Sequence, residues 1–119
     1  MNNRAFGTKG EEAAAHYLAS KGWTLLARNF RVGRMGELDI IARDGEYLSF
    51  VEVKTRSSHQ YGTPGEAVSY SKQATIRRLA QIYMERLGWY DLPVRFDVME
   101  LQMDRDGRIR DITLIKNAF

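Results

Sequence analysis

The chain has 119 residues, no cysteine and a formal net charge of +3 at neutral pH. This length suits one domain with a sizeable core, and the lack of cysteine excludes disulfide scaffolds, thiolate zinc sites and cysteine nucleophiles. No stretch approaches the ~18 apolar residues of a membrane span, so we expect residues 1–119 to form a single, non-exported domain in the reducing cytoplasm.

The first predicted element is a helix over Thr8–Ser20. Ala14, Ala15 and Leu18 recur along it at helical spacing. Gly22 then provides a stop signal.

Three strands are predicted next. The first covers Trp23–Arg31, and a Gly-containing loop then leads to a hairpin formed by Glu37–Arg43 and Glu46–Arg56. The dipeptide Asp44-Gly45 between the hairpin strands favours a two-residue type I′ turn.

The second half predicts a loop, a helix and two strands. Ser57–Glu66 is rich in glycine and serine, which predicts a mobile loop. A helix over Lys72–Leu87 carries an apolar stripe, and strands over Val94–Met103 and Arg108–Ile115 follow. This order predicts an α/β fold with a mixed five-stranded sheet flanked by helices.

Charged side chains end one face of the third predicted strand. Glu52 and Lys54 share the face of the apolar Phe50, because alternate strand residues point the same way. The expected turn pairs residue 43 with residue 46, which places Glu37 opposite Glu52. Asp39 then lies opposite Phe50 and diagonal to Glu52. Three carboxylates therefore converge beside Lys54.

Carboxylates held this close raise each other's pKa unless a cation neutralises them. With no cysteine and only His16 and His59, magnesium or manganese fits such a site better than zinc. A bound metal would activate water for phosphodiester hydrolysis, and Lys54 would stabilise the developing charge. The alternative is an ordinary cross-strand ion pair among Asp39, Glu52 and Lys54.

The segment GELDIIARDGEYLSFVEVKTR resembles the motif of the PD-(D/E)XK nuclease superfamily, with Asp39 followed after a hairpin by Glu52-Val53-Lys54. The leading proline of that motif is absent. Nearly the whole chain is similar to the YraN-like family of small bacterial proteins, which are related to archaeal Holliday-junction resolvases. The shared segments are Gly10-Glu11-Glu12, Gly36-Glu37-Leu38-Asp39, Phe50-Val51-Glu52-Val53-Lys54-Thr55-Arg56, Lys72 and Arg95-Phe96-Asp97.

The resemblance implies a restriction-endonuclease-like core that binds magnesium or manganese and cuts DNA, with branched DNA favoured. Asp39 and Glu52 would be metal ligands, with the Val53 carbonyl as a third. Lys54 and Glu11 would join Asp39 and Glu52 as catalytic residues. Because the resolvases act as dimers, the resemblance also implies a homodimer as one arrangement of this chain.

Glu11 has a second interpretation. Thr8 to Glu11 has the spacing of a capping box, in which the glutamate only satisfies backbone donors at the start of a helix. On the stripe that contains Leu18, however, Glu11 would point toward the sheet.

Further residues are candidates for contacts around the site. Lys72 and Gln73 open the second helix, where a phosphate could approach. Arg31 and Arg56 are candidate phosphate contacts, and we expect Glu37 beside the ligands or on the substrate side. Two other classes remain open: a nucleic-acid-binding module that keeps the fold but does not cut, and a structural protein stabilised by a metal.

Overall fold

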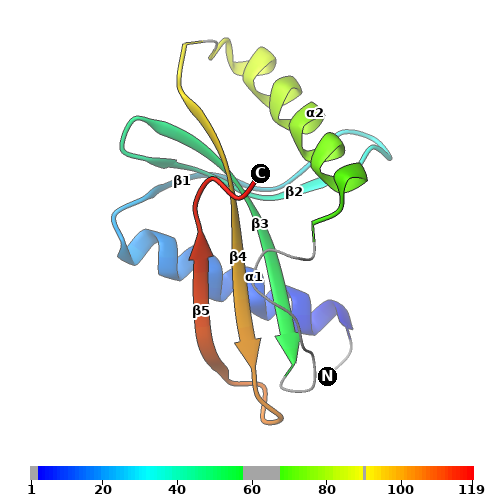
Figure 1. Ribbon diagram of the computed structural model, residues 1–119, viewed down its shortest axis with the longest axis vertical. Helices are drawn as coiled ribbons and strands as arrows, with labels where there is room; N and C mark the ends of the chain where they lie inside the picture. The colour runs from blue at the N-terminus through cyan, green and yellow to red at the C-terminus, as the bar shows by residue number, and fades with distance from the viewer. Residues whose placement is uncertain (1–2, 58–67, 90) are drawn as a thin grey trace.

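The computed structural model describes residues 3–57, 68–89 and 91–119, and its elements follow the predicted order (Figure 1). The α/β class and the sequence of helix, three strands, helix and two strands are confirmed. The elements are α1 (Asn3–Ser20), β1 (Thr24–Arg31), β2 (Glu37–Asp44), β3 (Tyr47–Ser57), α2 (Tyr70–Leu87), β4 (Val94–Met103) and β5 (Ile109–Ile115).

The five strands form one mixed sheet in the order β1-β2-β3-β4-β5. Neighbouring strands are antiparallel except β3 and β4, which pair in parallel from Leu48↔Val94 to Ser57↔Met103. A parallel pair needs a long crossover, and α2 lies within it. The two helices cover opposite faces of the sheet (Figure 1).

Two hydrophobic clusters fill the spaces between the sheet and its helices. On one face Leu48 and Phe50 of β3 pack with buried residues of α2. On the other face Val51 and Val53 pack with residues of α1. Strand β3 is therefore covered on both of its faces.

Helix α1 begins at Asn3 rather than at the predicted Thr8. Thr8 lies inside the helix, so the capping-box interpretation of Glu11 is wrong. Gly7 and Gly10 have poor helix propensity, so local sequence signals alone argue against a longer helix. Packing of α1 against the sheet outweighs this unfavourable propensity.

Helix α2 begins at Tyr70, two positions from the predicted start. Ser69 is its N-cap and accepts a hydrogen bond from the backbone N–H of Lys72 at 3.2 Å. Gly88 ends the helix in the left-handed conformation, with φ of 68°.

The hairpin exists, but its predicted register is wrong by two residues. Asp44 pairs with Tyr47, so the two-residue loop is Gly45-Glu46. Gly45 has a φ of 61° and takes the first central position, which suits a type II′ turn. A shift by two residues keeps every side chain on its predicted face.

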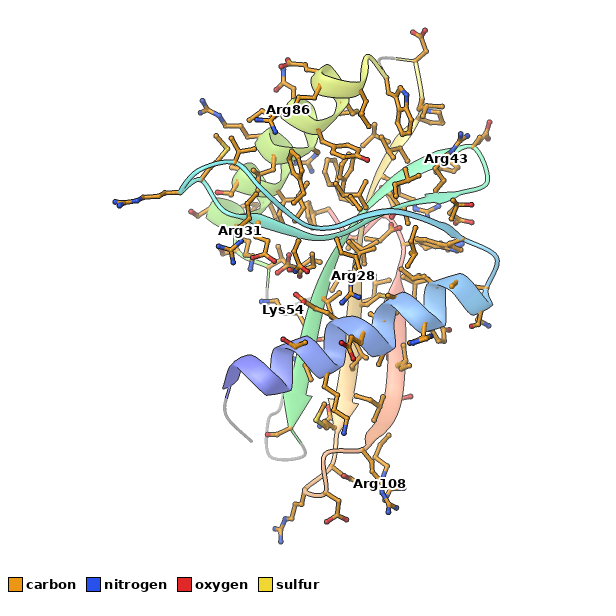
Figure 2. The ribbon with its side chains drawn as sticks, turned by 180° about the vertical axis from the view of Figure 1, so that it is seen from behind. Arg28, Arg31, Arg43, Lys54, Arg86 and Arg108 are labelled. Atoms are coloured by element: carbon orange, nitrogen blue, oxygen red, sulfur yellow. The ribbon has the colours of Figure 1, made fainter. Side chains whose placement is uncertain are left out.

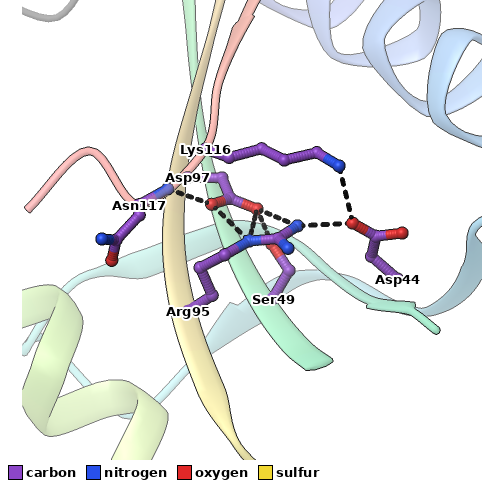
Figure 3. A network of polar contacts seen from close by, with 6 residues as sticks. All are labelled: Asp44, Ser49, Arg95, Asp97, Lys116 and Asn117. Carbon is purple, nitrogen blue, oxygen red and sulfur yellow. Dashed lines mark hydrogen bonds and ion pairs between the residues drawn. The ribbon is translucent and has the colours of Figure 1, made fainter. Parts of the chain in front are cut away.

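A buried polar network joins the hairpin, β4 and the segment after β5 (Figure 3). Asp97 is completely buried, accepts hydrogen bonds from Ser49, from the backbone N–H of Asn117 and from the side chain of Arg95, and forms an ion pair with Arg95. Arg95 also pairs with Asp44 at 2.9 Å. The network thus ties together parts of the chain that are far apart in sequence.

The loop predicted over Ser57–Glu66 falls almost wholly outside the described residues, and Ser57 itself is the last residue of β3. Across the described part of the chain, neither helix is long and apolar enough to cross a membrane.

Candidate functional site

The candidate site lies where β2 leaves β3. The ladder between these strands ends at Ile40↔Val51, while β2 continues to pair with β1 as far as Glu37. Beyond the ladder, the backbone N–H of Val53 donates to Asp39 Oδ2 at 2.8 Å. A side-chain carboxylate therefore takes the place of a backbone acceptor, and this holds Asp39 at the point of divergence.

Three carboxylates meet at this point. One oxygen from each of Glu11, Glu37 and Asp39 lies within 4.8 Å of the others. Glu11 comes from α1 and the other two come from β2. Carboxylates at this spacing repel one another unless protons, hydrogen-bond donors or cations compensate their charge.

Asn29 of β1 links two members of this cluster, Glu11 and Glu37. Its side-chain amide donates to Glu37, and it lies 3.3 Å from Glu11 Oε2. Its backbone has a φ of 53°, which is uncommon for a residue other than glycine and costs conformational energy. Asn29 was not among the predicted site residues. Its occurrence in a strand, where asparagine is depleted, was the available signal.

Glu52 lies next to the cluster but is held by a different partner. Its side chain is 5% exposed, and its Oε1 lies 2.7 Å from the Nζ of Lys72 at the start of α2. Glu52 is not one of the three residues whose oxygens lie within 4.8 Å of one another. Glu37 therefore lies inside this group of three and Glu52 lies beside it, and the expectation that Asp39 and Glu52 hold a metal stays a prediction.

Burial raises the pKa of Asp39 from 3.8 to about 8, and the neighbouring carboxylate of Glu52 is the next largest cause. The hydrogen bond from the Val53 backbone lowers this pKa, the carboxylate of Glu11 raises it further, and the ammonium of Lys72 lowers it. The net effect keeps Asp39 protonated near neutral pH when no further cation is present.

A cavity of about 370 Å³ opens between β2 and the first turns of α2. The residues that line it include two acidic residues, one lysine and three residues that carry a hydroxyl group. The full lining consists of Gly36, Glu37, Asp39, Ser69, Ser71, Lys72, Thr75 and Ile76. Gly36 allows the close approach of the two elements, since a Cβ there would come 2.9 Å from Thr75 Cγ2.

Lys54 follows Glu52 on the same face of β3 and is partly exposed. Figure 2 shows Lys54 on β3, with Arg28 and Arg31 of β1 labelled in the same part of the view. Within residues 3–57, 68–89 and 91–119, no hydrogen bond or ion pair to the side chain of Lys54 is found. Its ammonium is thus available to a ligand at the site.

The other predicted contact residues have partners of their own. Arg31 pairs with Glu37 at 2.7 Å and is 71% exposed. Arg56 pairs with Glu100 at 2.8 Å, farther along the sheet. Gln73 donates from its side chain to the Val68 carbonyl at 3.0 Å, which gives it a role in the entry to α2.

Comparison with known proteins places the chain among relatives along almost its full length. The family model described as "Uncharacterised protein family UPF0102" matches residues 10–101. A UPF0102 protein of Acetivibrio thermocellus is 51% identical over 99% of this chain and 93% of its own length. Another, from Symbiobacterium thermophilum, is 52% identical over 98% of both chains. A relative from Caldicellulosiruptor saccharolyticus is 44% identical over the full length of both.

Proposed function

The chain belongs to the UPF0102 family, and from the geometry of its site we propose that it is a metal-dependent endonuclease that hydrolyses DNA phosphodiester bonds. One observation carries the proposal: oxygens of Glu11, Glu37 and Asp39 come within 4.8 Å of one another beside the buried Glu52. The PD-(D/E)XK pattern of Asp39 and Glu52-Val53-Lys54 supports the same activity. The expected location of the protein is the cytoplasm.

The donor set fits a hard divalent cation such as magnesium or manganese. All the available ligand atoms are oxygens, which these ions prefer over nitrogen or sulfur. The raised pKa of Asp39 indicates a place where full ionisation needs additional positive charge. Asp39, Glu11 and Glu37 would hold the ion, with Glu52 and the Val53 carbonyl as further ligands. A bound ion would supply a water of lowered pKa and would stabilise charge on the phosphate.

Basic residues of the chain would stabilise charge during the reaction and position the DNA. Lys54 would orient the attacking water or stabilise a phosphate oxygen as charge develops on it. Arg31 and Lys72 would position the DNA backbone, because such contacts fix register without reading sequence. A preference for branched DNA and a dimeric arrangement rest on the resemblance to resolvases.

A second candidate is a nucleic-acid-binding module that does not cut. The ion pairs of Glu52 with Lys72 and of Glu37 with Arg31 favour it, because they neutralise two carboxylates without a metal. Binding would then depend on the basic residues alone and would not need a divalent ion.

The deciding experiment incubates labelled junction, flap, linear duplex and single-stranded DNA with the protein and magnesium or manganese, with a chelator as the blank. We expect Asp39→Asn and Lys54→Met each to lower the cleavage rate about 100-fold or more. Asp111→Asn and Lys21→Met change the same residue types at exposed positions outside the site and serve as controls. DNA binding without products in every metal would overturn the nuclease proposal in favour of the binding module.

A further inference from the structure

We propose that Lys72 is an exchangeable counterion that couples occupancy of the cation site to binding of a substrate phosphate. Lys72 would neutralise Glu52 while the cation site is empty, and it would pass to a phosphate once Glu52 serves as a ligand. The inference rests on the proposed function and adds an order of events to it.

The ion pair between Lys72 and Glu52 joins a buried carboxylate to the ammonium of a flexible, half-exposed side chain. Glu52 is 5% exposed, whereas the side chain of Lys72 is 45% exposed and lies 2.7 Å away. Leaving Glu52 charged and unpaired at this depth would be costly, so an ionised Glu52 needs a positive partner in every state of the site. The partner need not always be the same group.

The position of Glu52 indicates which group would replace Lys72. Glu52 is the second strongest cause of the raised pKa of Asp39, so the two carboxylates lie close enough to repel each other electrostatically. Yet the group formed by Glu11, Glu37 and Asp39 does not include Glu52. A side chain engaged by an ammonium on α2 is held away from that group, and a divalent ion between the carboxylates would compete with that ammonium.

The released ammonium already borders a space for its next partner. Lys72 lines the cavity of about 370 Å³ together with Ser71 and Thr75. An ammonium and hydroxyl donors are groups that bind phosphate oxygens. While the cation site is empty, the Lys72 ammonium lies 2.7 Å from Glu52 Oε1 and is engaged there. Phosphate binding is therefore expected after cation binding.

This exchange predicts opposite effects of one substitution on two affinities. Lys72→Met keeps the length of the side chain and removes its charge. The cation then has no ammonium to displace, so we expect Lys72→Met to bind Mn²⁺ roughly tenfold more tightly than the unaltered protein. DNA loses a contact that only the cation-bound state offers, so its binding should weaken.

The cation affinity is measured by titration calorimetry of the DNA-free protein with MnCl₂. Lys72→Arg keeps a positive charge and should bind Mn²⁺ about as the unaltered protein does. Lys116→Met is the matched control, because Lys116 forms an ion pair of 3.0 Å with Asp44 and is 51% exposed. We expect Lys116→Met to leave the affinity for Mn²⁺ unchanged.

The DNA affinity is measured by fluorescence anisotropy of a junction oligonucleotide, with Ca²⁺ and with chelator. The ratio of the two affinities gives the coupling between cation and DNA, which is commonly 5- to 150-fold for linked sites. We expect Lys72→Met to reduce this ratio by about fivefold or more and Lys72→Arg to preserve most of it. Thermal unfolding of each variant in chelator verifies that it folds.

The outcomes separate the two proposals. Tighter Mn²⁺ binding together with a reduced ratio supports the exchange. Weaker Mn²⁺ binding in Lys72→Met, or an unchanged ratio, overturns it while leaving the nuclease proposal standing. If the unaltered protein binds no divalent ion, the proposed function fails and the exchange fails with it.

Discussion

The acidic residues of the site differ in how the fold compensates their charge. Glu52 pairs with Lys72, and Glu37 pairs with Arg31. Asp39 has no cation within ion-pair distance among the described residues and accepts a hydrogen bond from a backbone N–H. This difference explains why its pKa, raised by burial and then by Glu52, departs so far from the ordinary value.

The raised pKa of Asp39 gives a prediction about stability and pH. The folded chain keeps a proton on Asp39 up to a pH of about 8, while the unfolded chain loses it near 3.8. The folded state therefore binds more protons across this window, and the free energy of unfolding falls as the pH rises through it. We expect Asp39→Asn to remove this slope and to be the more stable protein at pH 9 in chelator.

Urea unfolding at pH 5, 7 and 9 measures this effect. Magnesium at pH 8 should raise the midpoint for the unaltered protein and leave Asp39→Asn almost unchanged. Parallel pH profiles for the two proteins would contradict the protonation of Asp39 in the fold.

The sequence pattern predicted which side chains share a face of β3 better than it predicted their contacts with other elements. Alternation along β3 correctly put Glu52 and Lys54 on one face. The pairing of Lys72 with Glu52 depends on how α2 docks on the sheet, and no local pattern encodes that. The same holds for Asn29, whose contacts bridge three elements of the fold.

At the scale of elements, α1 carries Glu11 to the site because Gly10 lets it approach β3. A Cβ on Gly10 would come 1.8 Å from Thr55 Oγ1 and 3.0 Å from Thr55 Cβ. Glycine is a poor helix former, so its place here reflects close packing rather than helix stability. The helix and the carboxylate that it carries are thus positioned together.

Replacing Gly10 should separate its effect on the packing of α1 against β3 from its effect on helix stability. We expect Gly10→Ala to push α1 away from β3, to destabilise the fold by about 1–3 kcal/mol and to weaken divalent-cation binding. Gly7→Ala is the matched control, because nothing lies within 4 Å of its added Cβ. That variant should be more stable by about 0.5–1 kcal/mol, as alanine favours the helix.

Urea unfolding and Mn²⁺ titration of both variants would check this prediction. Equal effects at the two positions would refute the idea that Gly10 sets the spacing between α1 and β3.

The hairpin shows what an element's sequence leaves undecided. Asp44-Gly45 favours a type I′ turn, and Gly45-Glu46 satisfies a type II′ turn equally well. The second register is the one observed, with Asp44 opposite Tyr47. It leaves Asp44 next to Arg95 of β4, and this ion pair is a tertiary contact that turn propensities do not contain.

For the whole molecule, the sequence predicted the order of the elements and a mixed sheet. It did not predict the strand order, because the parallel pairing of β3 with β4 depends on contacts between residues far apart in the chain. The buried network around Asp97 is part of what secures this arrangement, since it connects β3, β4 and the segment after β5 (Figure 3).

We expect Asp97→Asn to destabilise the fold by about 3 kcal/mol, because it leaves the nearly buried Arg95 without its main counterion. Lys116→Met removes a half-exposed member of the same network and should cost less than about 1 kcal/mol. Chemical denaturation of both variants at pH 7 measures the difference. Similar small losses would mean that the network adds little to stability.

The two tryptophans lie on opposite sides of the sheet. Trp23 belongs to the cluster beneath α1, where the guanidinium of Arg95 lies 5.2 Å from its ring, and Trp89 packs against the cluster beneath α2. Each layer of the protein thus carries its own fluorophore. With Trp23→Phe and Trp89→Phe in turn, emission would report each layer separately and would reveal whether the two halves of the core melt as one cooperative unit.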